Sequence, residues 1–271
     1  MDEQIYNSIS LTKTAATITS LLGVSAPESA AAPIDIVLKK ANKAFSGEKA
    51  DTVVMYNPDA VALWLYQKYT HLFSDVLENS SLMLPLESVM PSVTPVCFAS
   101  MYTGAFPQVH GIQSYTKPVL KTDTVFDALI REGKKPVIIS TSGDSISKIF
   151  LERKMDYFIF DSAKECNAKA EEVIKSKEYD LIVLYNGNYD GTMHREGPEN
   201  ELSLNVLKEN AGVFAHLASL LKEYRKNENC CLFFAPDHGC HEIDGGCGSH
   251  GLLMPEDINI VHFYEFFPKT L

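Results

Sequence analysis

Apolar residues along the chain form short continuous runs, and stretches with helical spacing lie between these runs. Most of the runs have the length of a strand and end at Asn, Asp, Gly or Pro. The predicted strands are residues 52–56, 82–86, 136–140, 157–160, 181–185, 231–235 and 258–263. Apolar positions at steps of three and four predict helices over residues 61–73, 124–131, 163–175 and 202–224. This alternation predicts an α/β fold: a three-layer αβα sandwich with a mostly parallel central sheet.

A segment rich in Ala, Ser and Pro, residues 25–33, separates a short helical piece from the rest of the chain. We therefore expect an N-terminal helical extension over residues 1–33, packed on the core or linked to it. Residues 34–271 are expected to form one catalytic domain, because 271 residues with 45% hydrophobic content can bury one large core.

The charge of the chain narrows the range of partners. Acidic residues outnumber Lys and Arg by 35 to 24, which gives a net charge of -11, and the basic residues are scattered. Such a chain repels a phosphate backbone, so no nucleic-acid polymer is expected as a partner. An anionic substrate would need help from bound cations.

The first 26 residues do not have the pattern of a signal peptide, because Asp2, Glu3 and Lys13 interrupt them. No run of about 18 apolar residues occurs, so no membrane span or membrane partner is expected. The six cysteines are few for this length and two are adjacent, which favours reduced thiols over a disulfide framework. These features predict a cytoplasmic protein, and they leave its oligomeric state open.

Carboxylates and imidazoles follow several of the predicted strands. Ligands of a parallel sheet gather at the carboxyl ends of its strands, so these side chains are expected to meet at one edge. The candidates are Asp59, Asp190, His194, Asp237, His238 and, in a Gly-rich loop, His250.

Carboxylate oxygen and imidazole nitrogen together suit a divalent ion such as zinc or manganese. The spacing of four between Asp190 and His194 lets both converge over one helical turn. Six ligands exceed the needs of one tetrahedral ion. They suit two ions about 3.5–4 Å apart, an arrangement that holds both the attacking and the leaving oxygen in phosphoryl transfer.

Each of these residues also has a structural interpretation. A lone Asp after a strand is usually a turn or helix-cap residue, and Asn57 competes with Asp59 for the first ligand position. A structural zinc site of two Cys and two His is another possibility, although no Cys-x-x-Cys pair is present. Its ligands would be Cys240, His241, Cys247 and His250. Cys97 lies on an apolar stretch and is expected to be a buried, inert thiol.

Thr94 is expected at a helix start, after the strand predicted over residues 82–86. A hydroxyl there can cap free backbone N–H groups, which is a structural role. The same position favours an alkoxide and a phosphate, since the helix dipole is positive at this end. A nearby divalent ion would lower the pKa of the hydroxyl enough for attack.

Four ordered motifs occur over about residues 50–265: Thr94-Pro95 with Thr103-Gly104, Pro107 and His110-Gly111-Ile112; Asp190 and His194 with Gly197-Pro198; Asp237-His238-Gly239; and Gly248-Ser249-His250-Gly251. Together they resemble the type I phosphodiesterase and nucleotide pyrophosphatase branch of the alkaline phosphatase superfamily.

The resemblance implies an alkaline phosphatase-like fold with a site for two divalent metal ions, zinc in preference to manganese. One ion would be held by Asp190, His194 and His250. The other would be held by Asp59, Asp237, His238 and the oxygen of Thr94. The implied reaction is hydrolysis of a small phosphorylated substrate, of the phosphodiester or nucleotide pyrophosphatase type, with a phosphothreonine intermediate on Thr94.

Two departures from the family pattern bear on the substrate. The first motif is normally Asp-Gly, whereas this chain has Asn57-Pro58-Asp59-Ala60; Asp59 is the chosen ligand and Asn57 the alternative. Tyr115 stands where relatives that cleave nucleotides hold a phosphate oxygen with Asn, so Tyr115 is a candidate substrate-binding residue.

The departures keep other activities open. Phosphonoacetate-hydrolase-like or phosphomonoesterase activity is the alternative within the superfamily. A catalytically silent metal-binding relative is the alternative of another class. The chain lacks the Cys-x-Pro-x-Arg signature of sulfatases and has no room for the inserted domain of the related mutases.

Overall fold

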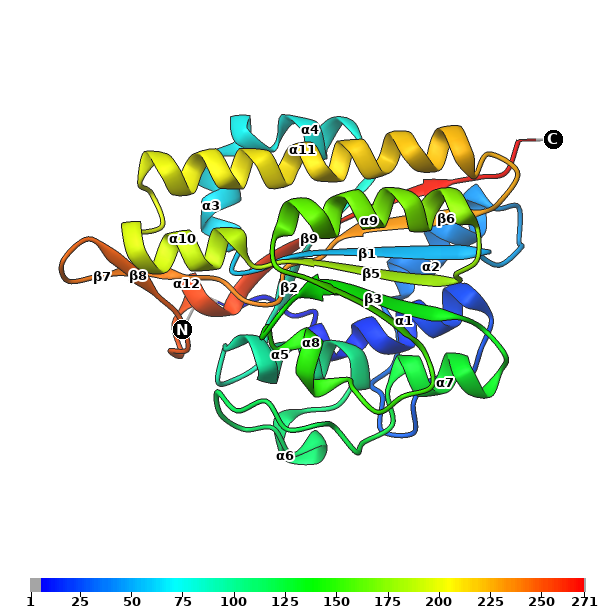
Figure 1. Cartoon of the computed structure of the whole chain (residues 1–271), viewed down its shortest axis with the longest axis horizontal. Coiled ribbons are helices and arrows are strands. Elements are labelled where there is room, and N and C mark those ends of the chain that lie inside the picture. The colour runs from blue at the N-terminus through cyan, green and yellow to red at the C-terminus, as the bar shows by residue number, and fades with distance from the viewer. Residues whose placement is uncertain (1–5, 271) are drawn as a thin grey trace.

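The computed structural model describes residues 6–270 and contains a central sheet of seven strands in the order β2-β9-β6-β1-β5-β3-β4 (Figure 1). Strand β9 is antiparallel to both of its neighbours, and the other neighbouring strands are parallel. The bounds are β1 (Thr52–Pro58), β2 (Leu82–Glu87), β3 (Pro136–Thr141), β4 (Asp156–Phe160), β5 (Leu181–Asn186), β6 (Cys230–Phe234) and β9 (Asn259–Phe267).

Helices cover both faces of this sheet, which confirms the predicted three-layer αβα sandwich (Figure 1). The upper layer contains α3 (Leu63–Lys68), η2 (Thr70–Phe73), α4 (Ser74–Glu78), α9 (Ala163–Ser176), α10 (Asn188–Glu196) and α11 (Glu201–Tyr224). The lower layer contains η1 (Leu11–Lys13), α1 (Thr14–Leu22), α2 (Asp35–Ala44), α5 (Thr94–Thr103), α6 (Pro107–His110), α7 (Val125–Arg131) and α8 (Ile146–Ile149).

A short hairpin projects from one end of the sheet, beside α10 (Figure 1). It consists of β7 (His241–Ile243) and β8 (Cys247–Ser249), and α12 (Pro255–Ile258) follows it before β9. No strand was predicted here, because each arm is only three residues long and the loop between them is rich in glycine.

Two hydrophobic cores lie on opposite faces of the sheet. Along β1, Val53 and Met55 belong to the core beneath α1 and α5, whereas Val54 and Tyr56 belong to the core beneath α9 and α11. Both faces are buried, so successive residues of the central strands are all apolar. This is why these strands appear in the sequence as unbroken runs rather than alternating patterns.

The predicted helix over residues 61–73 is wrong, because this segment breaks into α3 and η2. At Tyr69 the backbone leaves the helical region (φ -118°, ψ 39°), and its hydroxyl donates a hydrogen bond to Glu199 at 2.6 Å. The last strand also begins later than predicted, since Ile258 ends α12. The other predicted strands and helices agree with the structure within one or two residues.

The N-terminal helix α1 packs on the sheet: Ile18, Leu21 and Leu22 are buried in the lower core. The division of the chain at residue 33 stays a prediction. Among residues 6–270, no helix has both the length and the apolar content needed to cross a membrane.

Candidate metal centre

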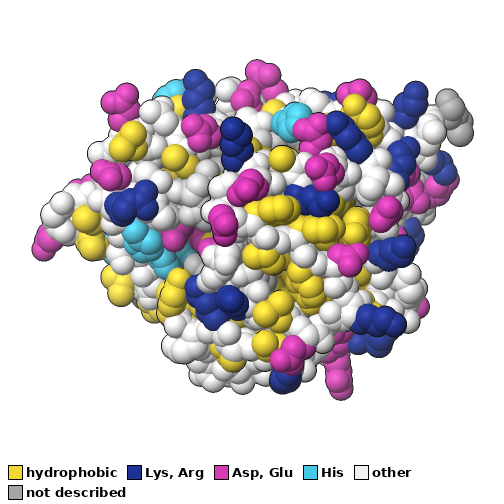
Figure 2. Space-filling view, viewed as in Figure 1, with side chains coloured by type: hydrophobic (Ala, Val, Ile, Leu, Met, Phe, Trp, Pro, Cys, Tyr) yellow, Lys and Arg dark blue, Asp and Glu magenta, His cyan; other side chains and the backbone are white. Residues whose placement is uncertain are grey.

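The candidate ligands come from the carboxyl ends of three neighbouring strands, β6, β1 and β5. Asp59 follows β1 directly, and Asp237 and His238 lie on the loop after β6. Asp190 and His194 lie one turn apart on α10, which begins just after β5. Figure 2 shows histidine side chains at the molecular surface beside acidic ones at the end of the molecule where α10 lies.

The last histidine, His250, comes from the end of the β7–β8 hairpin, which is tightly packed on α10. A Cβ atom on Gly248 would lie 2.2 Å from the Met193 sulfur, so only glycine allows this approach. The close contact places the Gly248 carbonyl 2.9 Å from Nδ1 of His194. Residues far apart in the sequence are thereby held in one site.

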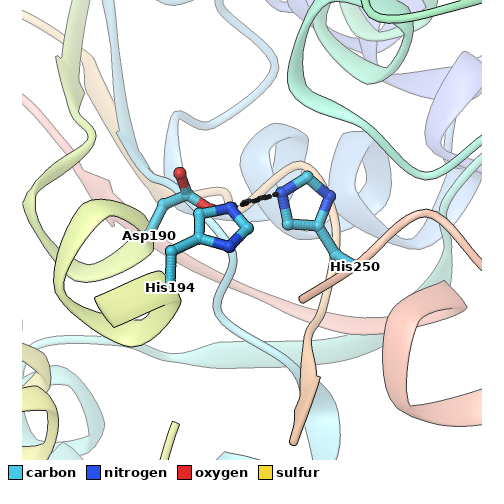
Figure 3. A group of neighbouring side chains, drawn as sticks. All are labelled: Asp190, His194 and His250. Atoms are coloured by element: carbon cyan, nitrogen blue, oxygen red, sulfur yellow. Dashed lines mark hydrogen bonds and ion pairs between the residues drawn. The ribbon is translucent and has the colours of Figure 1, made fainter. Parts of the chain in front are cut away.

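Asp190, His194 and His250 form one compact group (Figure 3). The Asp190 Oδ1 atom lies 3.3 Å from Nε2 of His194 and 3.3 Å from Nε2 of His250. The two Nε2 atoms lie 3.1 Å apart. The His194 side chain is 41% exposed, so this group, here called the outer group, opens to solvent.

Asp59, Asp237 and His238 form a second group, the inner group, which is buried. The His238 Nε2 atom lies 3.3 Å from Asp59 Oδ1 and 3.4 Å from Asp237 Oδ2. Thr94, the first residue of α5, is also buried, and its Oγ1 lies 3.4 Å from Asp59 Oδ2 and 3.3 Å from His238 Nε2. The rings of His238 and His250 stack at 4.0 Å, so the two groups adjoin.

All three imidazoles are held in the same tautomer. Nδ1 of His194, His238 and His250 lies 2.9 Å from the backbone carbonyl of Gly248, Gly239 and Ser92, respectively. A carbonyl only accepts, so each Nδ1 must donate, and in the neutral ring each Nε2 keeps its lone pair. This is the arrangement in which histidines bind metal ions, with a backbone carbonyl orienting the ring.

Charge is balanced within the outer group. Contact with the Asp190 carboxylate raises the pKa of His194 to about 9. Burial alone would raise the pKa of Asp190, but the neighbouring imidazoles of His194 and His250 outweigh it and lower that pKa. One carboxylate is thus stabilised by two imidazoles.

Charge is not balanced within the inner group. Burial, and then the charge of Asp190, raises the pKa of Asp59 to about 7. Burial and the neighbouring Asp59 raise the pKa of Asp237 well above its usual range. Burial also lowers the pKa of His238 to about 3, so this imidazole stays neutral and does not offset the carboxylates.

The residues of both groups fit divalent cations. One oxygen of each carboxylate, Asp59 Oδ1, Asp190 Oδ1 and Asp237 Oδ2, is buried without a hydrogen-bond partner. No lysine or arginine within residues 6–270 forms an ion pair with any of the three. Buried carboxylates need compensating positive charge, and lone pairs that face one another across 3.1 Å need an ion or a proton between them.

Part of the chain matches a known protein family. Residues 56–142, which include Asp59 and Thr94, match the family model of type I phosphodiesterases and nucleotide pyrophosphatases. Over these residues the chain resembles the type I phosphodiesterase and nucleotide pyrophosphatase branch of the alkaline phosphatase superfamily.

Similar solved structures agree on the fold. Murine ectonucleotide pyrophosphatase/phosphodiesterase 5 superposes with a TM-score of 0.59 at 18% identity, over 72% of this chain and 58% of that one. Phosphonoacetate hydrolase from Sinorhizobium meliloti 1021, in complex with phosphonoformate, gives 0.55 at 16% identity, over 70% of this chain and 57% of that one.

A curated human relative is the catalytic subunit of GPI ethanolamine phosphate transferase 2. It is 25% identical over 64% of this chain, and the match covers 18% of the human protein. The chain therefore corresponds to less than a fifth of that relative and to somewhat more than half of the solved ones.

Asn57 lies away from both groups. Its amide nitrogen donates to the Ala235 carbonyl at 2.6 Å, and its oxygen accepts from the Tyr102 hydroxyl at 2.6 Å. Asn57 therefore ties β1 to the β6 loop and to α5, and Asp59 is the residue that joins the inner group.

The alternative zinc site of two cysteines and two histidines does not form. Neither of the two possible metal-binding groups within residues 6–270 contains a cysteine. Cys240 is buried beside Tyr189, and His241 contacts Asp257 at 2.7 Å instead. Cys97 is fully buried, and burial raises the pKa of its thiol well above the usual range, as expected of an inert thiol.

Tyr185 is a site residue that sequence reasoning missed. It lies in β5, and its hydroxyl donates to Asp59 Oδ2, the oxygen that faces Thr94. A Cβ atom on Gly187 would lie 2.7 Å from this hydroxyl, so glycine makes room for it. In the sequence Tyr185 is one more apolar residue of a buried strand, and nothing distinguishes it there.

Proposed function

We propose that the chain is a metal-dependent hydrolase of phosphate esters, of the phosphodiester or nucleotide pyrophosphatase type, with Thr94 as its nucleophile. The observation that carries this proposal is the convergence of three Nε2 lone pairs and three partnerless carboxylate oxygens beside one buried threonine hydroxyl. An inactive variant of the murine relative, with a threonine replaced by alanine, has been solved with AMP. That structure and the phosphonoformate complex support a small phosphorylated substrate.

Thr94 suits the role of nucleophile by position. Its hydroxyl faces Asp59 Oδ2 and His238 Nε2, and both atoms can accept its proton. The N-terminus of the ten-residue helix α5 adds a positive dipole where the oxygen becomes negative. The N-cap residue of α5 is Val93, which supplies no side-chain capping hydrogen bond at this helix start.

The reaction proceeds in two displacements. The Thr94 oxygen bonds to phosphorus while the bond from phosphorus to the leaving oxygen breaks, and the leaving group takes a proton from solvent. The product is a phosphothreonine. Water then attacks phosphorus from the opposite face, the bond to Thr94 breaks, and Thr94 recovers its proton.

Asp190, His194 and His250 would hold one divalent ion, and Asp59, Asp237, His238 and Thr94 the second, with zinc preferred to manganese. When bound, the ions supply charge stabilisation and lower the pKa of the attacking oxygen. Tyr185 and the backbone carbonyls of Gly239, Gly248 and Ser92 keep the ligating side chains oriented.

Phosphonate cleavage is the second candidate, for two reasons. Phosphonoacetate hydrolase is among the similar folds, and Tyr115 replaces the Asn of nucleotide-cleaving relatives. Tyr115 lies on the loop after α6 and is 61% exposed, so its hydroxyl can reach a substrate oxygen. We assign it a substrate-binding role.

The test is to measure the metal content of the purified protein together with its turnover of a p-nitrophenyl phosphodiester, p-nitrophenyl phosphate and phosphonoacetate. Two ions per chain with ester turnover would support the proposal, and phosphonoacetate turnover alone would favour the second candidate. Two ions without turnover of any substrate would indicate a silent metal-binding relative. Thr94→Ser is the matched control for Thr94→Ala, because it keeps the hydroxyl.

A further inference from the structure

Lys117 lies at the same edge of the sheet as the metal centre. Its Nζ atom donates to the Gly143 carbonyl at 2.9 Å and lies 5.2 Å from the centre of the Tyr115 ring. Gly143 follows β3, and β3 is the neighbour of β5, after which α10 carries Asp190 and His194. The loop with Tyr115 and Lys117 is thus tied to the segment that follows β3, next to the strand end from which α10 starts.

Electrostatics supports this placement. Partial burial raises the pKa of Tyr115, and the negative charges of Asp190 and Asp59 raise it further. The hydroxyl is therefore within electrostatic range of both groups. Figure 2 shows Lys or Arg side chains at the surface on both sides of the histidines at this end of the molecule.

We propose that Lys117, held by Tyr115 and Gly143, forms a cationic subsite for a second negative charge on the substrate. This inference rests on the proposed function. Two divalent ions offset the three carboxylates and one further negative charge, which the attacking Thr94 oxygen supplies. A substrate with one negative charge then needs little additional positive charge. A substrate with a second negative charge needs another cation, and Lys117 provides it.

The second charge has two possible sources with the same chemistry. It can sit on the transferred phosphoryl group, as in a phosphate monoester, or on an adjacent phosphoryl group, as in a nucleoside diphosphate. Lys117 can serve either one, because its flexible stem lets the ammonium leave the Gly143 carbonyl and reach a phosphate oxygen.

The experiment compares Lys117→Met with the native protein on three substrates. These are p-nitrophenyl phosphate, methyl p-nitrophenyl phosphate, which carries one negative charge, and ADP. We expect kcat/KM for one of the doubly charged substrates to fall roughly tenfold or more, and for the singly charged diester to fall much less. Lys117→Arg should restore most of the loss. Lys121→Met, at an exposed lysine paired with Glu152, is the matched control.

A selective loss with p-nitrophenyl phosphate assigns the second charge to the transferred group, and a selective loss with ADP assigns it to the neighbouring group. An equal fall for all three substrates would overturn the subsite while leaving the hydrolase intact. If the native protein turns over none of them, the proposed function itself fails.

Discussion

The outer and inner groups consist of similar side chains but have opposite electrostatics. The outer group has one carboxylate and two imidazoles, and it opens to solvent at His194. The inner group has two carboxylates and one imidazole, and all three side chains are buried. The outer group can balance its charge by protonating a histidine, as the raised pKa of His194 indicates.

The inner group cannot balance its charge in this way, because burial keeps His238 neutral. Its carboxylates depend on a cation or on bound protons. The inner group should therefore bind its ion more tightly than the outer group and contribute more of the stability that metal binding provides. Five experiments test or refine this contrast.

Replacing the nucleophile separates chemistry from metal binding. Thr94→Ala should lower kcat by roughly a thousandfold or more, because it removes the hydroxyl proposed as nucleophile. It should keep both ions, since the other ligands remain. Mass spectrometry of metals and steady-state kinetics check both points. Unchanged turnover would remove Thr94 from the mechanism.

Removing one carboxylate from each group compares them directly. Asp237→Asn should abolish most activity and lose the inner ion, since one of two buried anionic ligands disappears. Asp190→Asn should lose the outer ion and retain the inner one. Metal content after dialysis distinguishes the two variants. An Asp237→Asn protein with two ions per chain would contradict the ligand assignment.

The two groups should lose their ions at different chelator concentrations. We expect a chelator to remove the outer ion first and the inner ion at higher concentration. A thousandfold excess of ion over its Kd is worth about 4 kcal/mol for each ion, so removal of both should lower Tm by roughly 15 °C. Thermal unfolding at graded chelator concentrations measures the order. Loss of both ions in one step would contradict the contrast.

The hairpin tests how the outer group is positioned. Gly248→Ala introduces a Cβ against the Met193 sulfur and should displace both His194 and His250. We expect weaker outer-ion binding and a tenfold or smaller loss of activity, with Tm of the metal-free protein changed little. Gly212→Ala is the control, because a Cβ there meets nothing closer than Asp75 at 3.7 Å.

The smallest effect is expected from Tyr185→Phe, which removes the hydrogen bond to Asp59 while keeping the ring packed against Phe98. Loss of one orienting hydrogen bond should lower kcat/KM a few-fold. The outer ion should be unaffected. A loss as large as that of Asp237→Asn would mean that Tyr185 takes a direct part in the chemistry.

The sequence by itself determined the layers of the fold and the types of ligand. Unbroken apolar runs predict strands buried on both faces, and polar residues after them predict a site at the carboxyl edge. The spacing of Asp190 and His194 shows their shared helical turn. These features are local, since they depend on residues within a few positions of one another.

Only the tertiary structure decided between Asn57 and Asp59, because both follow β1 and their side-chain partners come from other elements. The tertiary structure also showed that His250 joins the outer group whereas His241 contacts Asp257, and that Tyr185 and Gly248 contact residues of the site. It also set the charge difference between the two groups. Burial and neighbouring charge fix a pKa, and both are properties of the packed chain rather than of any short stretch of sequence.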